Sequence, residues 1–342
     1  MIDSPPSIRR RRPRRSLKAG TLALALLLLF EFAVARTNWA YKLTPGIFVE
    51  SIYALEDNVI EPSPVPTLAL FGSSRLQEAV APRLIEQELG LEEGEALNLA
   101  FPFGDVVGSR LLYERSRRKL SQLEVAVIGV EMWDLFGERG LDPLQEYFLP
   151  MQERLEHTGK DRVSLLVSSF WKTYAMRGMA GYIFGGLLRG GPEQGPLAAD
   201  GRLQYYAGEG RDGPEIIDAA LQFDDRFAEL ERQGDLSGRG DQAELQRFID
   251  MLTADGVTVV IVHLPMRRDF ITEVETRLPT ITAETQRVLA DLAGPARVEM
   301  ETSLEALGIP DTSYRDFGHP AEAGVNPMTR YIASLVMEVR GR

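Results

Sequence analysis

Short apolar runs alternate with amphipathic stretches along most of the chain after residue 66. Five runs are mostly apolar, which is typical of strands that are buried on both faces of a sheet. They span residues 67–71, 96–101, 125–130, 257–264 and 298–300. Apolar positions recur at helical spacing over residues 77–89, 106–120, 241–255, 278–293 and 320–339. The alternation predicts an α/β fold of three layers, with helices on both faces of a mostly parallel sheet.

The alternation stops between the third and fourth predicted strands. Residues 137–240 contain two aromatic clusters and then a run rich in glycine and proline. We interpret this segment as an insertion over the carboxyl edge of the sheet, where it is a candidate lid or acceptor-binding element. For any one of its aromatic side chains, a place in a small helical core is the simpler interpretation.

The first 35 residues differ from the rest of the chain in charge and hydropathy. Residues 1–18 hold six arginines and one lysine against Asp3 alone, so they carry +6 and the remainder of the −12 chain carries −18. Residues 19–35 are predominantly apolar, and as a helix they would rise about 26 Å, close to the ~30 Å of a hydrocarbon core. Because cations mark the cytoplasmic side of a span, we expect a membrane anchor with the acidic body outside the cytoplasm.

A cleaved signal peptide is the competing interpretation of this segment. Residues 21–30 form a short apolar core, and Ala33-Val-Ala35 has the small-x-small pattern of a cleavage site. Both interpretations export the acidic body, whose charge argues against nucleic acid as a partner. Four parts are expected, namely a basic cytoplasmic tail over residues 1–18, a transmembrane anchor over 19–35, a linker over 36–66 and a folded domain over 67–342.

Composition excludes several kinds of active site. The chain has no cysteine and only three histidines. Disulfides, thiolate zinc sites, cysteine nucleophiles and multi-histidine metal centres are therefore ruled out. No glycine-rich phosphate-binding motif follows the first predicted strand, which argues against a nucleotide-binding protein.

Candidate chemistry lies in the loops that follow the strands, where parallel sheets place their sites. The first strand ends in Gly72-Ser73-Ser74-Arg75. A serine on a tight turn between a strand and a helix exposes its hydroxyl beside backbone N–H groups that can stabilise an oxyanion. Capping of the next helix by Ser73 or Ser74 explains the same turn. After the second strand, Gly104 lets a backbone N–H approach a ligand closely.

The three histidines can be considered one by one. His157 lies in a polar helical stretch that is typical of a solvated surface. His263 ends the fourth predicted strand, where a buried core histidine is favoured over a residue at the rim of a site. His319 follows Asp316 by three positions on a loop before the last helix, so the carboxylate can fix the imidazole tautomer and raise its basicity. His319 is therefore the candidate general base.

The Gly-Ser-Ser turn, Gly104, the third strand and Asp316-x-x-His319 resemble, in this order, the SGNH (GDSL-like) hydrolase superfamily over most of residues 67–340. The chain looks more like the membrane-anchored proteins of envelope polysaccharide modification, as in alginate O-acetylation and teichoic-acid D-alanylation, than like small secreted esterases. The resemblance implies a flavodoxin-like sheet with Ser74 as nucleophile, His319 as general base and Asp316 as its orienting partner. It implies an oxyanion hole formed by the N–H groups of Ser74 and Gly104. Further candidates for the lining of the site are Ser73, Arg75, Asn98, Glu131 and His263.

Glu131 departs from the superfamily pattern. Where the superfamily has Gly-x-Asn-Asp with an asparagine that donates to the oxyanion, this chain has Gly129-Val-Glu131-Met-Trp133-Asp134. An ionised glutamate cannot donate, and the loss of one such donor costs about 10²–10³ in rate. Four alternatives are open: two backbone donors suffice, Glu131 points away, Glu131 is protonated, or the site is degenerate.

Together with the predicted anchor, the resemblance implies a membrane-anchored serine esterase or O-acyltransferase that acts outside the cytoplasm through an acyl-enzyme. We expect acyl esters of a cell-envelope polysaccharide as substrates, acetyl esters first among them, and neither a metal nor a cofactor. The expected partners are the bilayer, through residues 19–35, an envelope glycan and a membrane-bound acyl-donor protein. The alternative is a catalytically impaired protein of the same fold that binds glycan or assists envelope assembly, and Glu131 favours it.

Overall fold

The computed structural model covers most of the predicted α/β domain. It describes residues 14–32, 48–63, 65–102, 104–135, 239–299, 307–314 and 316–341, with short pieces between 148 and 174. Residues 1–13 of the predicted tail lie outside the described residues. Of the predicted insertion, only the short pieces and residues 239–240 are described. His157 also lies outside them.

The sheet has five parallel strands in the order β2-β1-β3-β4-β5. The strands are β1 (Leu68–Phe71), β2 (Ala96–Asn98), β3 (Val125–Val130), β4 (Thr258–His263) and β5 (Arg297–Glu299). Nearly all side chains of the first four strands are buried, which is typical of a parallel sheet covered on both faces. The predicted α/β class and parallel sheet are confirmed.

Alternate residues of each strand face two separate hydrophobic layers. One layer contains Leu68 and Leu70 of β1 together with three helices. These are α4 (Ser74–Ala79), α5 (Pro82–Leu89) and α16 (Glu322–Arg340). The other layer contains Ala69 and Phe71 of β1 and includes four helices of ten or more residues. These are α6 (Val106–Ser116), α13 (Arg239–Ala254), α14 (Arg268–Arg277) and α15 (Ile281–Ala290).

The structure breaks one predicted helix into two. The periodicity predicts a single helix over residues 77–89, whereas α4 and α5 are separated by Val80 and Ala81. Pro82 explains the break, because proline lacks the N–H of an internal helical hydrogen bond and fits best in the first turn. The periodicity did not predict α14. Two short elements also belong to the described domain, namely α7 (Met132–Leu135) and the 3₁₀ turn η6 (Asp311–Ser313).

Residues 48–60 correct the prediction of a linker over residues 36–66. They form α3 (Phe48–Leu55) and the π-helix η2 (Glu56–Ile60). Four of their side chains are at most 2% exposed and belong to the same core layer as Phe71, namely Ile52, Leu55, Val59 and Ile60. Their spacing along one helical face explains the packing. The folded domain therefore includes residues well before Thr67.

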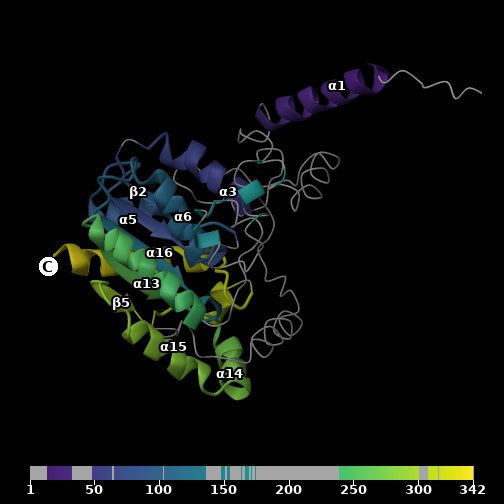
Figure 1. Cartoon of the computed structure of the whole chain (residues 1–342). Coiled ribbons are helices and arrows are strands. Elements are labelled where there is room, and N and C mark those ends of the chain that lie inside the picture. The colour runs from purple at the N-terminus through teal and green to yellow at the C-terminus, as the bar shows by residue number, and fades with distance from the viewer. Residues whose placement is uncertain are drawn as a thin grey trace, which may run out of the picture.

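The helix α1 (Arg14–Phe30) covers most of the stretch that the sequence predicts as a membrane anchor. Figure 1 shows α1 apart from the sheet and its helices, and the leucines within residues 22–29 of α1 are exposed, from 39% for Leu28 to 63% for Leu29. Among the helices that the structure describes, none is both long enough and apolar enough to cross a membrane. The last three residues of the predicted anchor, 33–35, lie outside the described residues.

The strand order changes direction at β1. The chain passes from β1 to β2 on one side and then crosses to β3 on the other side of β1. In doubly wound sheets the loops at the carboxyl ends of two such strands diverge and leave a crevice, which is the usual place for a ligand. Residues 72–75 follow β1 and Glu131 follows β3, so both lie at this point.

Candidate active site

A tight turn carries the two serines from β1 into α4. Gly72 has a φ of 155°, and a Cβ there would come within 3.0 Å of a carbonyl oxygen of β3, so the position favours glycine. Ser73 is the N-cap of α4, and its Oγ accepts a hydrogen bond from the Arg75 N–H at 3.2 Å. The Ser74 hydroxyl faces His319 instead. Of the two serines that the sequence left open, Ser73 caps the helix and Ser74 faces an imidazole.

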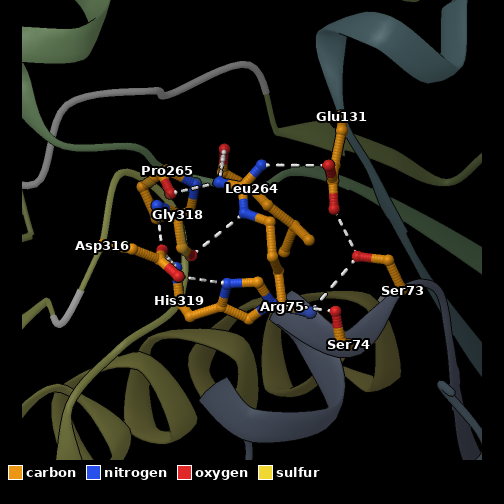
Figure 2. A network of polar contacts seen from close by, with 9 residues as sticks. All are labelled: Ser73, Ser74, Arg75, Glu131, Leu264, Pro265, Asp316, Gly318 and His319. Carbon is orange, nitrogen blue, oxygen red and sulfur yellow. Dashed lines mark hydrogen bonds and ion pairs between the residues drawn. The ribbon is translucent and has the colours of Figure 1, made fainter. Parts of the chain in front are cut away.

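Ser74, His319 and Asp316 form a hydrogen-bonded chain (Figure 2). Ser74 Oγ lies 2.8 Å from His319 Nε2, and His319 Nδ1 lies 2.8 Å from Asp316 Oδ2. The other carboxylate oxygen of Asp316 accepts hydrogen bonds from the N–H groups of Gly318 at 2.8 Å and of His319 at 2.6 Å. The three residues therefore meet in one place, although 245 positions separate Ser74 from His319.

The charge of Asp316 decides the roles of the two imidazole nitrogens. Burial raises the pKa of the Asp316 carboxyl, but hydrogen bonds from the His319 ring and from two backbone N–H groups outweigh it and hold that pKa well below its usual value. The carboxylate is therefore ionised and can only accept hydrogen bonds. Nδ1 of His319 must then carry a proton, and in the neutral imidazole Nε2 accepts the hydrogen bond of the Ser74 hydroxyl.

Glu131 faces Arg75 and Ser73 at the end of β3. The residue is 3% exposed, and its Oε2 lies 3.3 Å from Nη1 of Arg75. Its Oε1 accepts a hydrogen bond from the Ser73 hydroxyl (Figure 2). Arg75 is also 3% exposed, so the two buried charges balance each other. A cation and a hydroxyl thus engage the two carboxylate oxygens of Glu131.

Two backbone carbonyl groups that the sequence analysis did not single out also belong to this network. Arg75 donates from Nε to the Gly318 carbonyl oxygen at 3.0 Å and from Nη2 to the Pro265 carbonyl oxygen at 2.7 Å. A Cβ at Gly318 would overlap the guanidinium of Arg75. The glycine between Asp316 and His319 could therefore have indicated a close contact at this position. The contact with the Pro265 carbonyl oxygen could not be predicted from the sequence, because every residue has a carbonyl group.

Gly104 lies against the serine turn, but a neighbouring carbonyl group already engages its N–H. A Cβ at this position would overlap the Gly72 carbonyl oxygen, which explains the glycine. The Gly104 N–H donates to the Phe101 carbonyl oxygen at 2.8 Å. It can donate to an oxyanion only when that hydrogen bond opens.

Asn98 and His263 do not join the chain of Ser74, His319 and Asp316. Asn98 is fully buried, and its Nδ2 donates to carbonyl oxygens at the end of α4 and just after it, of Leu76, Gln77 and Val80. Its predicted place in the site lining is therefore corrected, because its amide closes the end of α4. His263 faces a small cavity with Met132, Ile271 and Leu289 on the α14 and α15 side of the sheet.

The charge state of His263 agrees with the interpretation of a buried core histidine. Burial, with a smaller effect of the nearby Arg75 cation, lowers the pKa of His263 to about 3. The ring is therefore neutral at physiological pH. In the part of the chain that the structure describes, neither ring nitrogen has a hydrogen-bond partner.

A hydroxyl, an imidazole and an ionised carboxylate in series are the groups that nucleophilic acyl transfer uses. The described residues include no cluster of three or more histidine or carboxylate side chains that could hold a metal ion. No protein family and no curated protein matches this chain. The chain of hydrogen bonds through His319 is thus the feature that defines the class of site.

Proposed function

We propose that the protein is a serine esterase or O-acyltransferase of the SGNH type. The observation that carries this proposal is the 2.8 Å contact between Ser74 Oγ and His319 Nε2, with the ionised Asp316 on the other side of the imidazole. The strand order supports it, because this order is that of flavodoxin-like sheets and Ser74 follows β1, one of the two strands at their ligand-binding point.

In the acylation step, Ser74 Oγ attacks the carbonyl carbon of an ester. The new C–O bond forms while His319 Nε2 takes the hydroxyl proton, and the carbonyl π electrons move to the carbonyl oxygen. As the tetrahedral intermediate collapses, the ester C–O bond breaks and His319 gives the proton to the departing alkoxide. Asp316 keeps the imidazole in its tautomer and stabilises the imidazolium.

In the deacylation step, His319 takes a proton from the incoming nucleophile. That nucleophile attacks the acyl-enzyme carbonyl, the bond to Ser74 Oγ breaks, and His319 returns the proton to the serine. Water as the nucleophile gives a carboxylic acid, and a sugar hydroxyl gives a new ester. The first reaction is that of an esterase and the second that of an O-acyltransferase. In both reactions every proton and bond is accounted for by Ser74, His319 and the substrates.

The resemblance assigns the oxyanion to the N–H groups of Ser74 and Gly104. Ser74 is the first residue of α4, where an N–H lacks an intrahelical acceptor. The Gly104 N–H must turn away from the Phe101 carbonyl oxygen when substrate binds. The turn before α6 therefore completes the oxyanion hole.

The proposed substrates are acyl esters of a cell-envelope polysaccharide, and the domain acts on them outside the cytoplasmic membrane. Seven cations precede the apolar stretch over residues 19–35, which is the charge pattern of an anchor with its N-terminus inside. The resemblance to membrane-anchored proteins of polysaccharide modification supports acetyl esters, with a membrane-bound protein as acyl donor.

A non-catalytic role in glycan binding or envelope assembly is the alternative. Two observations favour it. Glu131 occupies the place of the asparagine of the superfamily, and the N–H of Gly104 is engaged by the Phe101 carbonyl. Neither observation prevents acylation of Ser74, so the reactivity of that serine distinguishes the two functions.

Hydrolysis of p-nitrophenyl acetate by the full-length chain in detergent tests the proposal. His319→Ala removes the base, so we expect kcat/KM to fall by at least ~10³-fold. Arg330→Ala is the control, since Arg330 pairs with Glu88 on the exposed surface, and we expect it to hydrolyse like the wild type. Hydrolysis unchanged by His319→Ala contradicts the triad, and a wild type without hydrolysis favours the binding role.

A further inference from the structure

We infer that Arg75 is a positioning residue that sets the separation of Ser74 and His319, and that Glu131 is its counter-ion. This inference rests on the proposed function, because it concerns the geometry of the same triad. Arg75 follows Ser74 directly in the sequence. A side chain at this position that also binds the loop of His319 fixes the position of the nucleophile relative to the base.

The Arg75 side chain connects the loops after three strands (Figure 2). Its Nε donates to the Gly318 carbonyl oxygen after β5, and its Nη2 donates to the Pro265 carbonyl oxygen after β4. Its Nη1 lies 3.3 Å from Glu131 Oε2 after β3. Because only 3% of Arg75 is exposed, protein groups surround the guanidinium and fix its place.

Both backbone polar groups of Gly318 are hydrogen-bonded to side chains of this network. Its N–H donates to Asp316 Oδ1 at 2.8 Å, and its carbonyl oxygen accepts from Arg75. A Cβ at this position would approach the guanidinium carbon to 2.7 Å, so glycine lets Arg75 lie directly against this peptide. His319 is the next residue, and the position of Arg75 therefore determines where the imidazole lies.

Glu131 compensates the buried charge of Arg75. A buried cation that loses its partner is strongly destabilising, and Glu131 Oε2 is that partner. The other oxygen of Glu131 accepts from the Ser73 hydroxyl, and Ser73 Oγ accepts from the Arg75 N–H. The three residues form a closed ring beside Ser74. A neutral asparagine could not balance Arg75, which explains why a glutamate stands here.

Arg75→Lys tests the inference, because lysine keeps the charge and loses the planar fork that reaches two carbonyl oxygens. We expect kcat for p-nitrophenyl acetate to fall about 10²-fold with KM nearly unchanged, since a displacement of about 1 Å costs that much in rate. Arg267→Lys is the matched control, because Arg267 pairs with the exposed Asp269. A kcat of Arg75→Lys equal to that of the wild type overturns the inference.

Two further variants test the contacts of Arg75 with Gly318 and with Glu131. Gly318→Ala keeps both residues of the ion pair but displaces the Arg75 guanidinium from the loop, so we expect a fall in kcat similar to that of Arg75→Lys. Glu131→Asn introduces the residue of the superfamily. If Glu131 were only a missing oxyanion donor, kcat would rise. We expect it to fall at least ~10-fold, because Arg75 loses its counter-ion, and a rise overturns the inference.

Crystal structures of the full-length wild type and of Arg75→Lys give a measurement that needs no substrate. We expect the separation of Ser74 Oγ and His319 Nε2, 2.8 Å in the wild type, to lengthen in the variant. An unchanged separation overturns the inference. If the separation lengthens but the wild type neither hydrolyses the ester nor reacts with a serine-directed probe, the proposed function fails and the positioning role of Arg75 stands.

Discussion

Asp316 uses its two carboxylate oxygens for two different tasks. Oδ2 accepts from the imidazole of His319, and Oδ1 accepts from the N–H groups of Gly318 and His319. The first contact selects the tautomer with the proton on Nδ1, and the second closes the loop that carries His319. Because both contacts favour the ionised form, the charge of this one residue supports the shape of the loop and the orientation of the ring.

The stability of the protein should therefore depend on the ionisation of Asp316. The pKa of Asp316 in the folded state lies below its value in the unfolded chain, about 3.9. The carboxylate thus contributes stability above that pH, and the contribution is lost as the pH falls below it. We expect Asp316→Asn, which does not titrate, to be less stable than the wild type by on the order of 2 kcal/mol at pH 7.

Urea unfolding of the wild type and of Asp316→Asn at several pH values measures this effect. The difference in free energy of unfolding between the two proteins should shrink as the pH falls from about 5 toward 2. A difference that stays constant over this range would show that the Asp316 charge is not stabilised in the fold.

At the scale of elements, neighbouring side chains at the end of β4 face opposite sides of the sheet. Val262 lies in the layer of α4, α5 and α16, and His263 faces the cavity beside α14 and α15. The backbone after His263 then supplies the Pro265 carbonyl oxygen to Arg75. The end of β4 therefore carries a buried neutral imidazole and, two residues later, a backbone carbonyl group that binds Arg75.

This burial of His263 predicts a loss of stability in mild acid. The unfolded chain takes up a proton on this histidine below about pH 6.5, whereas the folded protein resists protonation until about pH 3. The free energy of unfolding should therefore fall as the pH drops between these values, by about 3 kcal/mol at pH 4. Thermal and urea unfolding of His263→Leu should show a weaker loss over the same range. Parallel pH curves for the two proteins would contradict the neutral buried state.

At the scale of the whole molecule, the predictable features were those encoded by local patterns. Strands buried on both faces appear as short apolar runs, which is why the parallel sheet could be predicted. Ser74, Asp316 and His319 stand out because each lies in a short motif after a strand. Residues 48–60 were missed because the proline-rich run that follows them suggested an extended linker.

The contacts of Arg75 could not be predicted for a different reason. They join Arg75 to Pro265 and Gly318 across 190 and 243 positions of sequence, and two of the acceptors are backbone carbonyl groups that no residue type marks. The same limit explains Asn98, whose amide binds carbonyl groups of α4 and the turn that follows it. Motifs thus marked the candidate site residues, and the topology of the sheet determined which groups contact them.

The most direct test of the central claim is to locate the serine that reacts with a fluorophosphonate probe. Peptide mass spectrometry of the labelled full-length chain should place the adduct on Ser74, whose hydroxyl faces His319. Ser74→Ala should abolish labelling, whereas Ser73→Ala should still be labelled, because the Ser73 hydroxyl bonds Glu131. Equal labelling of the wild type and Ser74→Ala, or an adduct on Ser73, would contradict the assignment of Ser74 as the nucleophile.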